Sequence, residues 1–258
     1  IMFSWNTTVD EYQVTLFGLK MRFYRNSTRS FFRWRSKLEK VMQLTPSMVA
    51  LHRETFSKYK NCHQGRDVVI VGTGPTLSDY IPIKNAIHIG VNSALLLDKV
   101  TMNFLFVHDK VAFDKCSAEI LNGKGRNFFG ITGEKNIISD QYLEGIDCER
   151  YYVDSQMYFK DFPYDISNAF LADYSTVIFS ALQFALWTNP ERIYLVGCDC
   201  TEFGYFDQSE KKSKSNIKNW KTGWEKFKNF QESYYPKTQI VSIRPIGLKD
   251  LFNEVVND

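Results

Sequence analysis

The side chains of this sequence that are best suited to chemistry follow short apolar runs. His108 and Asp109 come directly after residues 103–107, which places an acid/base candidate beside a carboxylate. Asp199 follows residues 192–197, and packing does not explain a carboxylate there, because burying an unpaired charge is costly. We take Asp199 as the strongest functional candidate and His108 and Asp109 as candidate catalytic residues. A solvated loop start is the alternative for His108 and Asp109.

A glycine-rich loop follows the first apolar run of the chain. Glycines let a backbone approach a phosphate or a ribose closely, and a following helix would point its N–H groups at the anion. The motif is neither a Walker A loop nor a complete G-x-G-x-x-G fingerprint, because Leu77 replaces the third glycine. A plain tight turn is therefore the alternative to a nucleotide-binding loop. The residues of this candidate loop are Gly72, Thr73, Gly74, Pro75 and Thr76.

Two other polar positions are typical of ligand contacts. Asn92 ends a second apolar run, and its amide offers a donor and an acceptor that fit a phosphate or a base edge, or that cap a turn. Ser175 and Thr176 begin a predicted helix, whose N–H groups would hold a second anionic part of the ligand. We assign these three residues, together with the glycine-rich loop and Asp199, to nucleotide binding.

The elements that must position these residues alternate between strands and helices. Alternation of this kind predicts an α/β fold, a mostly parallel Rossmann-like sheet with helices on both faces. Ligands bind beyond the carboxyl ends of such strands, which is where the candidate residues stand. The irregular, aromatic and acidic stretch 151–173 is expected to be a lid over the site. The apolar runs predicted as strands are 68–72, 86–91, 103–107, 127–131, 192–197 and 238–243, and the clearest helical stretches are 176–188 and 216–233.

The first 60 residues differ in character from the rest, and the chain is divided accordingly into a basic N-terminal extension, 1–60, and a nucleotide-binding catalytic domain, 61–258. Residues 14–24 alternate as in a short hairpin with Gly18 at its turn. A basic amphipathic helix is predicted over residues 27–42. A second helix, opened by Thr45, Pro46 and Ser47, leads towards Tyr59 and completes this helical extension.

The basic segment of residues 20–42 indicates contact with an anionic surface. Eight basic residues lie between Lys20 and Lys40, opposed only by Glu39. An amphipathic helix of this composition can lie in a membrane interface, and we expect a peripheral contact with an anionic membrane. Packing of its apolar side on the catalytic domain or on another subunit is the alternative.

Composition restricts the class of protein. The 258 residues are 44% hydrophobic and 24% charged, which suits one globular α/β domain with an appendage. A net charge of +3 does not indicate a nucleic-acid partner. Five scattered cysteines favour reduced thiols and a cytoplasmic location. No apolar run is long enough to span a bilayer.

The sequence offers no ligand set for a metal ion. It contains no Asp-x-Asp pair to hold a divalent ion against a diphosphate. Cys198 and Cys200 lack further Cys or His partners at finger-like spacing. His52, His63 and His88 are interpreted as ordinary surface or packing histidines. We therefore expect no metal and no cofactor.

The order and spacing of these motifs resemble the Rossmann-like family that joins family 42 sialyltransferases to the 6-hydroxymethylpterin diphosphokinase-like proteins. The resemblance covers roughly residues 66–252. It implies a GT-A-like variant of the parallel-sheet fold, and a CMP-linked sialic acid or related nonulosonic acid as donor, contacting the first loop and Asn92. It also implies metal-independent transfer in which hydroxyls, often of tyrosine, stabilise the departing phosphate, and Tyr205 stands where such a group is expected. The matching pieces are 71–77, 90–92, 175–185 with 193–199, and the tail 223–227 with 248–252.

The leading interpretation is a glycosyltransferase of bacterial surface polysaccharide synthesis. It would take a nucleotide-sugar donor and a glycan or lipid-linked acceptor, at the inner face of the plasma membrane and as a possible homo-oligomer. The family supplies a histidine base after the strand that precedes Asp199, but no histidine follows His108 here. Either His108 or Asp109 then deprotonates the acceptor, or the reaction differs. The alternatives are a diphosphotransferase acting on a small alcohol, and a non-catalytic nucleotide- or glycan-binding module.

Overall fold

The computed structural model describes residues 4–8, 11–16, 19–24, 45–108, 110–132, 138, 143–154, 161–207 and 214–255. The chain divides into two compact units, Ile1–Leu44 and Thr45–Asp258. No helix among the described residues is long and apolar enough to cross a membrane.

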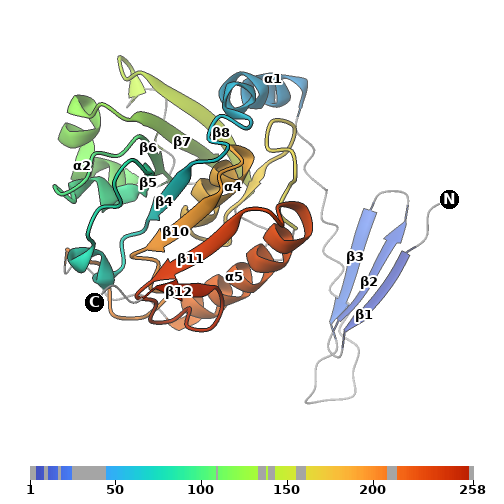
Figure 1. Ribbon diagram of the computed structural model, residues 1–258. Helices are drawn as coiled ribbons and strands as arrows, with labels where there is room; N and C mark the ends of the chain where they lie inside the picture. The colour runs from blue at the N-terminus through green and yellow to red at the C-terminus, as the bar shows by residue number, and fades with distance from the viewer. Residues whose placement is uncertain are drawn as a thin grey trace. The chain divides into compact units, whose positions relative to one another are not determined.

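The first unit contains a three-stranded antiparallel sheet, formed by β1 (Ser4–Thr8), β2 (Glu11–Leu16) and β3 (Leu19–Tyr24) in that order (Figure 1). Leu16 pairs with Leu19, so β2 and β3 form the hairpin predicted for residues 14–24. Strand β1 is an addition that the sequence did not indicate. The turn residue Gly18 and the predicted basic helix of residues 27–42 lie outside the described residues.

The second unit is built on a nine-stranded sheet in which every neighbouring pair of strands is parallel. The strand order is β12-β11-β10-β4-β5-β6-β7-β8-β9 (Figure 1). The six predicted strands are confirmed, and β8, β9 and β12 are additional. The bounds are β4 (Asp67–Val71), β5 (Ile87–Val91), β6 (Phe104–Val107), β7 (Arg126–Thr132), β8 (Cys148–Asp154), β9 (Leu171–Ala172), β10 (Arg192–Val196), β11 (Gln239–Ile243) and β12 (Asn253–Val255).

The strand order reverses between β4 and β10. From β4 the chain adds strands in one direction as far as β9, and then returns to the opposite side of β4 to form β10, β11 and β12. In open parallel sheets, ligands bind beyond the carboxyl ends of the strands at such a switch point. The topology therefore selects the ends of β4 and β10 as the place for a site.

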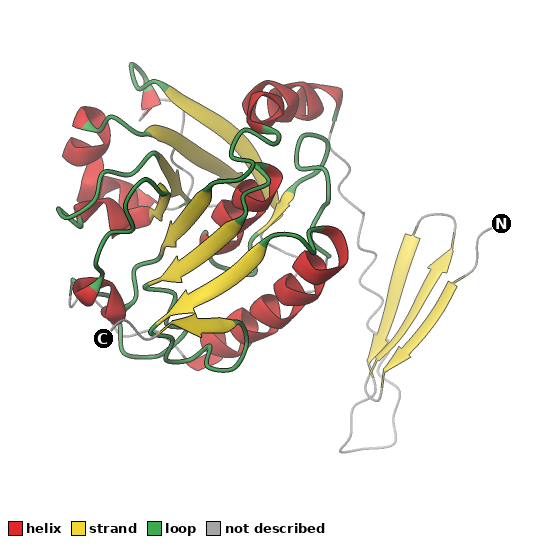
Figure 2. Ribbon diagram, viewed as in Figure 1, coloured by secondary structure: helices red, strands yellow, loops and turns green. Residues whose placement is uncertain are grey.

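Helices cover both faces of this sheet, as β4 illustrates. Val68 and Ile70 belong to one hydrophobic cluster, with residues of α1, α4 and α5, while Val69 and Val71 belong to another, with residues of η2 and η3. Helix α2 packs on the same side as η3. The predicted Rossmann-like α/β fold is confirmed (Figure 2). The helices are α1 (Pro46–Phe56), α2 (Lys110–Asn122), α4 (Ile178–Trp187) and α5 (Lys214–Tyr234), with 3-10 helices η1 (Ser57–Tyr59), η2 (Pro75–Asp79) and η3 (Asn92–Leu96).

Helix α1 begins where the sequence predicts. The Thr45 hydroxyl accepts the N–H of Met48, and Pro46 occupies the first turn, where no backbone donor is needed. The helix packs against β8, where the Thr55 hydroxyl donates a hydrogen bond to the carbonyl of Arg150. It therefore lies in the same compact unit as the sheet, whereas the sequence analysis grouped it with the N-terminal extension.

The stretch of residues 151–173 is not a lid in its described parts, so this expectation is wrong for 151–154 and 161–173. Tyr151, Phe162, Ile166 and Leu171 are all buried in the main hydrophobic cluster. Their aromatic and apolar side chains fill the space between the sheet and its helices, because such burial is the dominant favourable term in folding. Residues 155–160 lie outside the described part of the chain.

Helix α5 approaches α4 closely at one glycine. A Cβ atom added to Gly223 would lie 2.7 Å from Cε2 of Phe179 and 2.9 Å from Cγ of Tyr174. Real Cβ atoms do not come so near to other carbon atoms, so the helix can pack here only without a side chain. The same close packing brings the indoles of Trp220 and Trp224 towards the carboxyl ends of the strands.

We predict that Gly223→Ala lowers the free energy of unfolding by about 1–3 kcal/mol, because it overpacks this contact. Helix propensity alone predicts the opposite, a gain of about 1 kcal/mol. Urea denaturation of the variant separates the two effects by sign. Lys221→Ala, at an exposed position of the same helix, is the matched control and should stay within about 0.5 kcal/mol of the wild type. A stabilised Gly223→Ala variant would contradict the close contact.

Candidate active site

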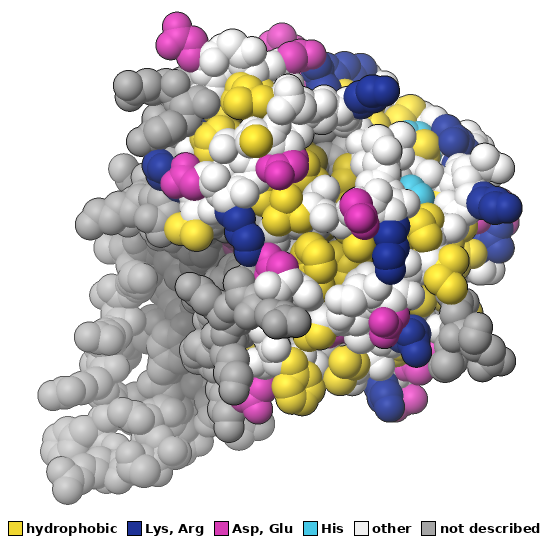
Figure 3. Space-filling view, turned by 90° about the vertical axis from the view of Figure 1, so that its left-hand side faces the viewer, with side chains coloured by type: hydrophobic (Ala, Val, Ile, Leu, Met, Phe, Trp, Pro, Cys, Tyr) yellow, Lys and Arg dark blue, Asp and Glu magenta, His cyan; other side chains and the backbone are white. Residues whose placement is uncertain are grey.

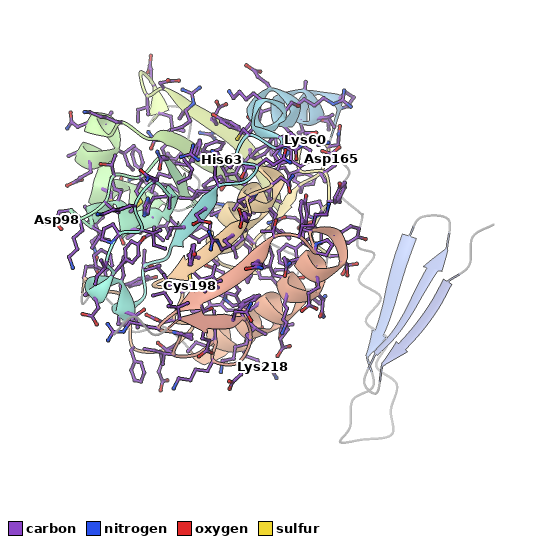
Figure 4. The ribbon with its side chains drawn as sticks, viewed as in Figure 1. Lys60, His63, Asp98, Asp165, Cys198 and Lys218 are labelled. Atoms are coloured by element: carbon purple, nitrogen blue, oxygen red, sulfur yellow. The ribbon has the colours of Figure 1, made fainter. Side chains whose placement is uncertain are left out.

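A cavity of about 300 Å³ lies at the switch point, beyond the carboxyl ends of β4, β5, β6 and β10. Cys198, which Figure 4 labels at the end of β10, belongs to its wall. Nine predicted site residues line the cavity: Gly72, Thr73, Gly74, Asn92, His108, Ser175, Thr176, Asp199 and Tyr205. Pro75 and Thr76 begin η2 next to it, and Asp109 lies outside the described residues. The lining residues that the sequence analysis did not select include Asp173, Trp220 and Trp224.

The glycine-rich loop is packed against the loop that follows β10. The Gly72 N–H donates to the carbonyl of Val196 at 2.8 Å, and the Gly74 N–H donates to the carbonyl of Gly197 at 2.7 Å. A Cβ atom at Gly72 would overlap the carbonyl oxygen of Gly197. The glycines are therefore required for contact between two protein loops, in addition to any contact with a ligand.

Asp199 holds this loop in place. Its side chain is buried, and its two carboxylate oxygens accept the N–H of Thr76 at 2.9 Å and the hydroxyl of Thr76 at 2.6 Å. The carboxylate thus satisfies a donor at the start of η2, as an N-cap residue does. A Cβ atom at Gly74 would overlap this carboxylate. Asp199 therefore acts on the shape of the loop, and its effect on a ligand would be transmitted through Thr76.

The cavity wall contains polar atoms that have no hydrogen-bond partner among the described residues. The Oδ1 atom of Asn92 and the Oγ1 atom of Thr201 are both buried and unpaired. Within the loop from Gly72 to Thr76, the N–H of Thr73 is the one backbone donor without an acceptor in the described part of the chain. Leaving a buried polar atom unpaired costs about 1–3 kcal/mol. Thr73, Asn92 and Thr201 all line the cavity, so this wall supports a polar ligand.

Unusual backbone conformations gather at the same place. Asn92, Tyr174, Ser175 and Cys200 have φ angles of 46°, 44°, 62° and 48°, in the left-handed region that residues other than glycine rarely adopt. Three of these four line the cavity, and Tyr174 immediately precedes Ser175. Such conformations cost free energy and cluster at functional sites. Their concentration here supports a binding or catalytic role for this end of the sheet.

His108 lies between two other titratable side chains. Its Nε2 atom is 2.5 Å from the hydroxyl oxygen of Tyr151, and its Nδ1 atom is 4.0 Å from Oδ2 of Asp173. Burial lowers the pKa of His108 to about 3, so the ring is neutral at neutral pH. Burial also raises the pKa of Tyr151 well above its ordinary value, so its hydroxyl keeps its proton.

Asp173 is held at the end of the two-residue strand β9. The side-chain amide of Gln183, on α4, bonds both the N–H and the carbonyl of Ala172, which fixes this strand at the sheet edge. Oδ1 of Asp173 accepts the N–H of Ser175 at 3.0 Å. Burial raises the pKa of Asp173 to about 6; the hydrogen bond from Ser175 opposes this change, and the charge of Asp154 adds to it.

The charge of the cavity restricts its ligand. Its described lining contains Asp173 and Asp199 but neither lysine nor arginine. The described residues also contain no group of three or more His, Cys, Asp or Glu side chains that could hold a metal ion. Basic and acidic side chains are interspersed on the described surface towards which the strands point (Figure 3). An anion in this cavity would therefore be held by N–H dipoles and hydroxyls among the described residues.

Comparison with known proteins gives distant structural similarities. No family model matches the chain, and no curated protein matches it. The sialyltransferase CstII from Campylobacter jejuni, in complex with the substrate analogue cytidine-5'-monophosphate, is 16% identical, with a TM-score of 0.42 over 69% of this chain and 80% of that chain.

Two further solved structures are similar at the same level. CstII in complex with CMP-3FNeuAc is 17% identical, with a TM-score of 0.41 over 74% of this chain and 86% of that chain. The monofunctional alpha-2,3-sialyltransferase Cst-I from Campylobacter jejuni is 16% identical, with a TM-score of 0.42 over 69% and 75%. Identities of 16–17% and TM-scores of 0.41–0.42 assign no function to this chain.

We predict that Gly74→Ala destabilises the protein in the absence of any ligand, by about 1–3 kcal/mol, because the added methyl group overlaps the Asp199 carboxylate. Thermal unfolding of the ligand-free variant measures this effect. Ser78→Ala, at an exposed position of η2, is the control. If Gly74→Ala changed nucleotide affinity but left unfolding unaltered, the glycine would serve the ligand alone.

We also predict that Asp173→Asn stabilises the protein at neutral pH. The pKa of Asp173 is higher in the folded state than its ordinary value of 3.8, so folding stability falls as pH rises from about 4 to about 6. Above pH 6 the penalty is complete, and the difference between the two pKa values corresponds to about 3 kcal/mol. The amide has no charge to bury and can still accept the Ser175 N–H.

Urea denaturation at pH 7.5 and at pH 3.8 tests this prediction. The gain from Asp173→Asn should be large at the higher pH and should nearly vanish at the lower one. Asp98→Asn, at an exposed position, removes the same charge and should show little effect at either pH. An Asp173→Asn variant that loses stability at pH 7.5 would show that the carboxylate is favourably paired.

Proposed function

We propose that this chain is a glycosyltransferase that transfers a sugar from a nucleotide-activated donor to a hydroxyl group of a glycan or lipid-linked acceptor. The observation that carries this proposal is one cavity whose two walls carry different kinds of polar group. One wall, at β4 and β5, has the N–H of Thr73 and the Oδ1 atom of Asn92, neither of which has a partner among the described residues. The other, at β6 and β9, has the titratable pair of His108 and Asp173. The first suits a donor, and the second suits an acceptor hydroxyl that must lose a proton.

The wall at β4 and β5 fits a nucleoside monophosphate linked to a sugar. Such a donor carries one phosphodiester charge, which a backbone N–H and neutral side chains can bind. A nucleoside triphosphate carries several charges and normally requires a magnesium ion held by carboxylates. With no lysine or arginine in the described lining, the donor with the smaller charge is favoured. The sequence resemblance further favours a CMP-linked sialic acid or related nonulosonic acid.

The leaving phosphate would be stabilised by hydroxyl groups. Tyr205, Ser175 and Thr176 all line the cavity, from the segment after β10 and from the start of α4. Donors placed where negative charge develops lower the barrier most, because they stabilise the transition state more than the ground state. We assign Tyr205 to this role, and propose transfer without a metal ion.

The cellular setting that suits this activity is bacterial surface polysaccharide synthesis in the cytoplasm. The basic segment of residues 20–42 would hold the enzyme beside an anionic membrane and a lipid-linked acceptor, since each basic side chain near such a surface contributes about 1 kcal/mol. This part of the proposal depends on the sequence, because residues 25–44 lie outside the described chain.

Turnover of a panel of nucleotide sugars, with and without EDTA, tests the proposal. We expect release of CMP from a CMP-linked sugar in the presence of a glycan acceptor, at a rate that EDTA leaves unchanged. Activity that requires magnesium and a nucleoside triphosphate would favour the diphosphotransferase. Nucleotide binding without turnover of any donor would favour the non-catalytic module.

Asn92→Asp provides the matched binding test. Aspartate keeps the shape of asparagine and tolerates the left-handed backbone, but it exchanges the amide donor for a negative charge. We predict that it weakens CMP affinity at least tenfold, equivalent to about 1.4 kcal/mol, in calorimetric titrations. Asn122→Asp, at an exposed position of α2, should bind CMP like the wild type. Equal affinity of the two variants would remove Asn92 from the donor site.

A further inference from the structure

We propose that Asp173 accepts the proton of the acceptor hydroxyl, while His108, oriented by Tyr151, donates a hydrogen bond from Nδ1 to the same oxygen atom. This inference rests on the proposed glycosyl transfer and deepens it. The role of base, for which the sequence suggested His108 or Asp109, is thereby assigned to Asp173, which the sequence did not indicate.

The hydrogen bond from Tyr151 determines which nitrogen of His108 carries the proton. Tyr151 is fully buried and keeps its hydroxyl proton, which needs an acceptor. The Nε2 atom of His108 lies 2.5 Å away and can accept it. Ser180 is the second neighbour of the Tyr151 hydroxyl, and a hydrogen bond from Ser180 to the Tyr151 oxygen opposes the effect of burial on the Tyr151 pKa. With Ser180 as the donor to that oxygen, the Tyr151 proton is directed to Nε2 of His108, and we assign the proton of the neutral ring to Nδ1.

Nδ1 of His108 faces the free side of the Asp173 carboxylate. Oδ1 of Asp173 accepts the Ser175 N–H, whereas Oδ2 has no hydrogen-bond donor among the described residues and lies 4.0 Å from Nδ1. That distance is too long for a direct hydrogen bond. A hydroxyl oxygen about 2.8 Å from both atoms would see them about 90° apart, so it can donate to Oδ2 and accept from Nδ1. Nδ1 of His108 and Oδ2 of Asp173 therefore form a binding site for one hydroxyl group.

The charges around Asp173 suit it to take a proton. The titratable groups that face it are His108, directly after β6, and Tyr151 and Asp154 on β8. The first two are neutral, and the third is an acid. No lysine or arginine is among the described residues of the cavity wall. Burial raises the pKa of Asp173 to about 6, so the carboxylate is ionised at neutral pH and yet basic enough to accept a proton. A histidine with a pKa of about 3 is a far weaker base.

The transfer step is balanced with these groups. The acceptor oxygen forms a bond to the anomeric carbon of the donor sugar, while the bond from that carbon to the phosphate oxygen breaks. The electron pair of the broken bond leaves with the nucleoside monophosphate. The hydroxyl proton moves to Oδ2 of Asp173 and is later released to solvent. His108 keeps its Nδ1 proton throughout and fixes the direction of the attacking lone pair.

Kinetics of Asp173→Asn and two His108 variants test the assignment. We expect Asp173→Asn to lower kcat at least 100-fold while leaving CMP affinity within twofold of the wild type. Wild-type kcat/KM should fall below about pH 6, and this limb should be absent from the residual activity of Asp173→Asn. His108→Asn retains a donor near the Nδ1 position and should keep more activity than His108→Ala, with the acid limb unchanged. An active Asp173→Asn, or loss of the acid limb in His108→Asn, would overturn the assignment.

The protonated nitrogen of His108 can be measured without activity, by ¹⁵N NMR of the imidazole rings. The chain has four histidines, and His52 is an internal reference. Its Nε2 accepts the Tyr152 N–H at 2.7 Å and its Nδ1 lies 2.9 Å from the carbonyl of Ile166, so it must be protonated at Nδ1. His108 should show the same pattern and lose it in Tyr151→Phe. A proton on Nε2 of His108 would overturn the inference.

These outcomes separate this inference from the proposed function. If the wild type transferred no sugar from any nucleotide donor, the glycosyltransferase proposal would fail. If the wild type were active and Asp173→Asn equally so, only the assignment of the base would fail.

Discussion

The contact between the loops after β4 and β10 is the constraint on which the site depends. At the point where the strand order reverses, the Gly74 N–H bonds the Gly197 carbonyl, and the Asp199 carboxylate holds Thr76. Glycine is required there because a Cβ atom would overlap the opposite loop. Once the two loops are joined, Thr73 and Asn92 line one cavity. The glycine-rich motif, which is typical of phosphate binding, thus first allows two loops of the same chain to pack together. A ligand can then bind the polar groups that this contact does not use.

The groups proposed for binding and catalysis at this end of the sheet lower the stability of the folded state. The cavity combines a buried carboxylate, a buried neutral imidazole and left-handed residues, each of which costs folding free energy. The remainder of the unit offsets this cost through extensive apolar burial: α4 is buried at every one of its positions, and the rings of Phe106 and Phe128 stack 4.6 Å apart beneath the site. The rigid helix and sheet hold the polar groups in positions that they would not adopt alone.

The sequence predicts the parts of this fold that local pattern controls. Apolar runs that end in glycine or a polar residue mark β4, β5, β6 and β10, and their ends carry the residues that line the cavity. Strand β8 alternates buried and half-exposed side chains, with charged residues among them, and resembles a loop in composition. Strand β9 has two residues and depends on Gln183 from α4. Asp173 follows β9, so no local signal placed it at a strand end, and only the tertiary structure brings it to His108.

The strand order also determines at which stage of synthesis the cavity can form. Thr76 and Asp199 are 123 positions apart in the chain. Strands β4 to β8 can pair progressively as they are synthesised, each with its neighbour in sequence, but β4 stays an exposed edge until β10 has been made. Closing so long a loop is slow, because its entropy is lost before the new contacts form. The cavity can therefore be completed only after β10 has been made, and until then β4 is an apolar edge strand without its second neighbour.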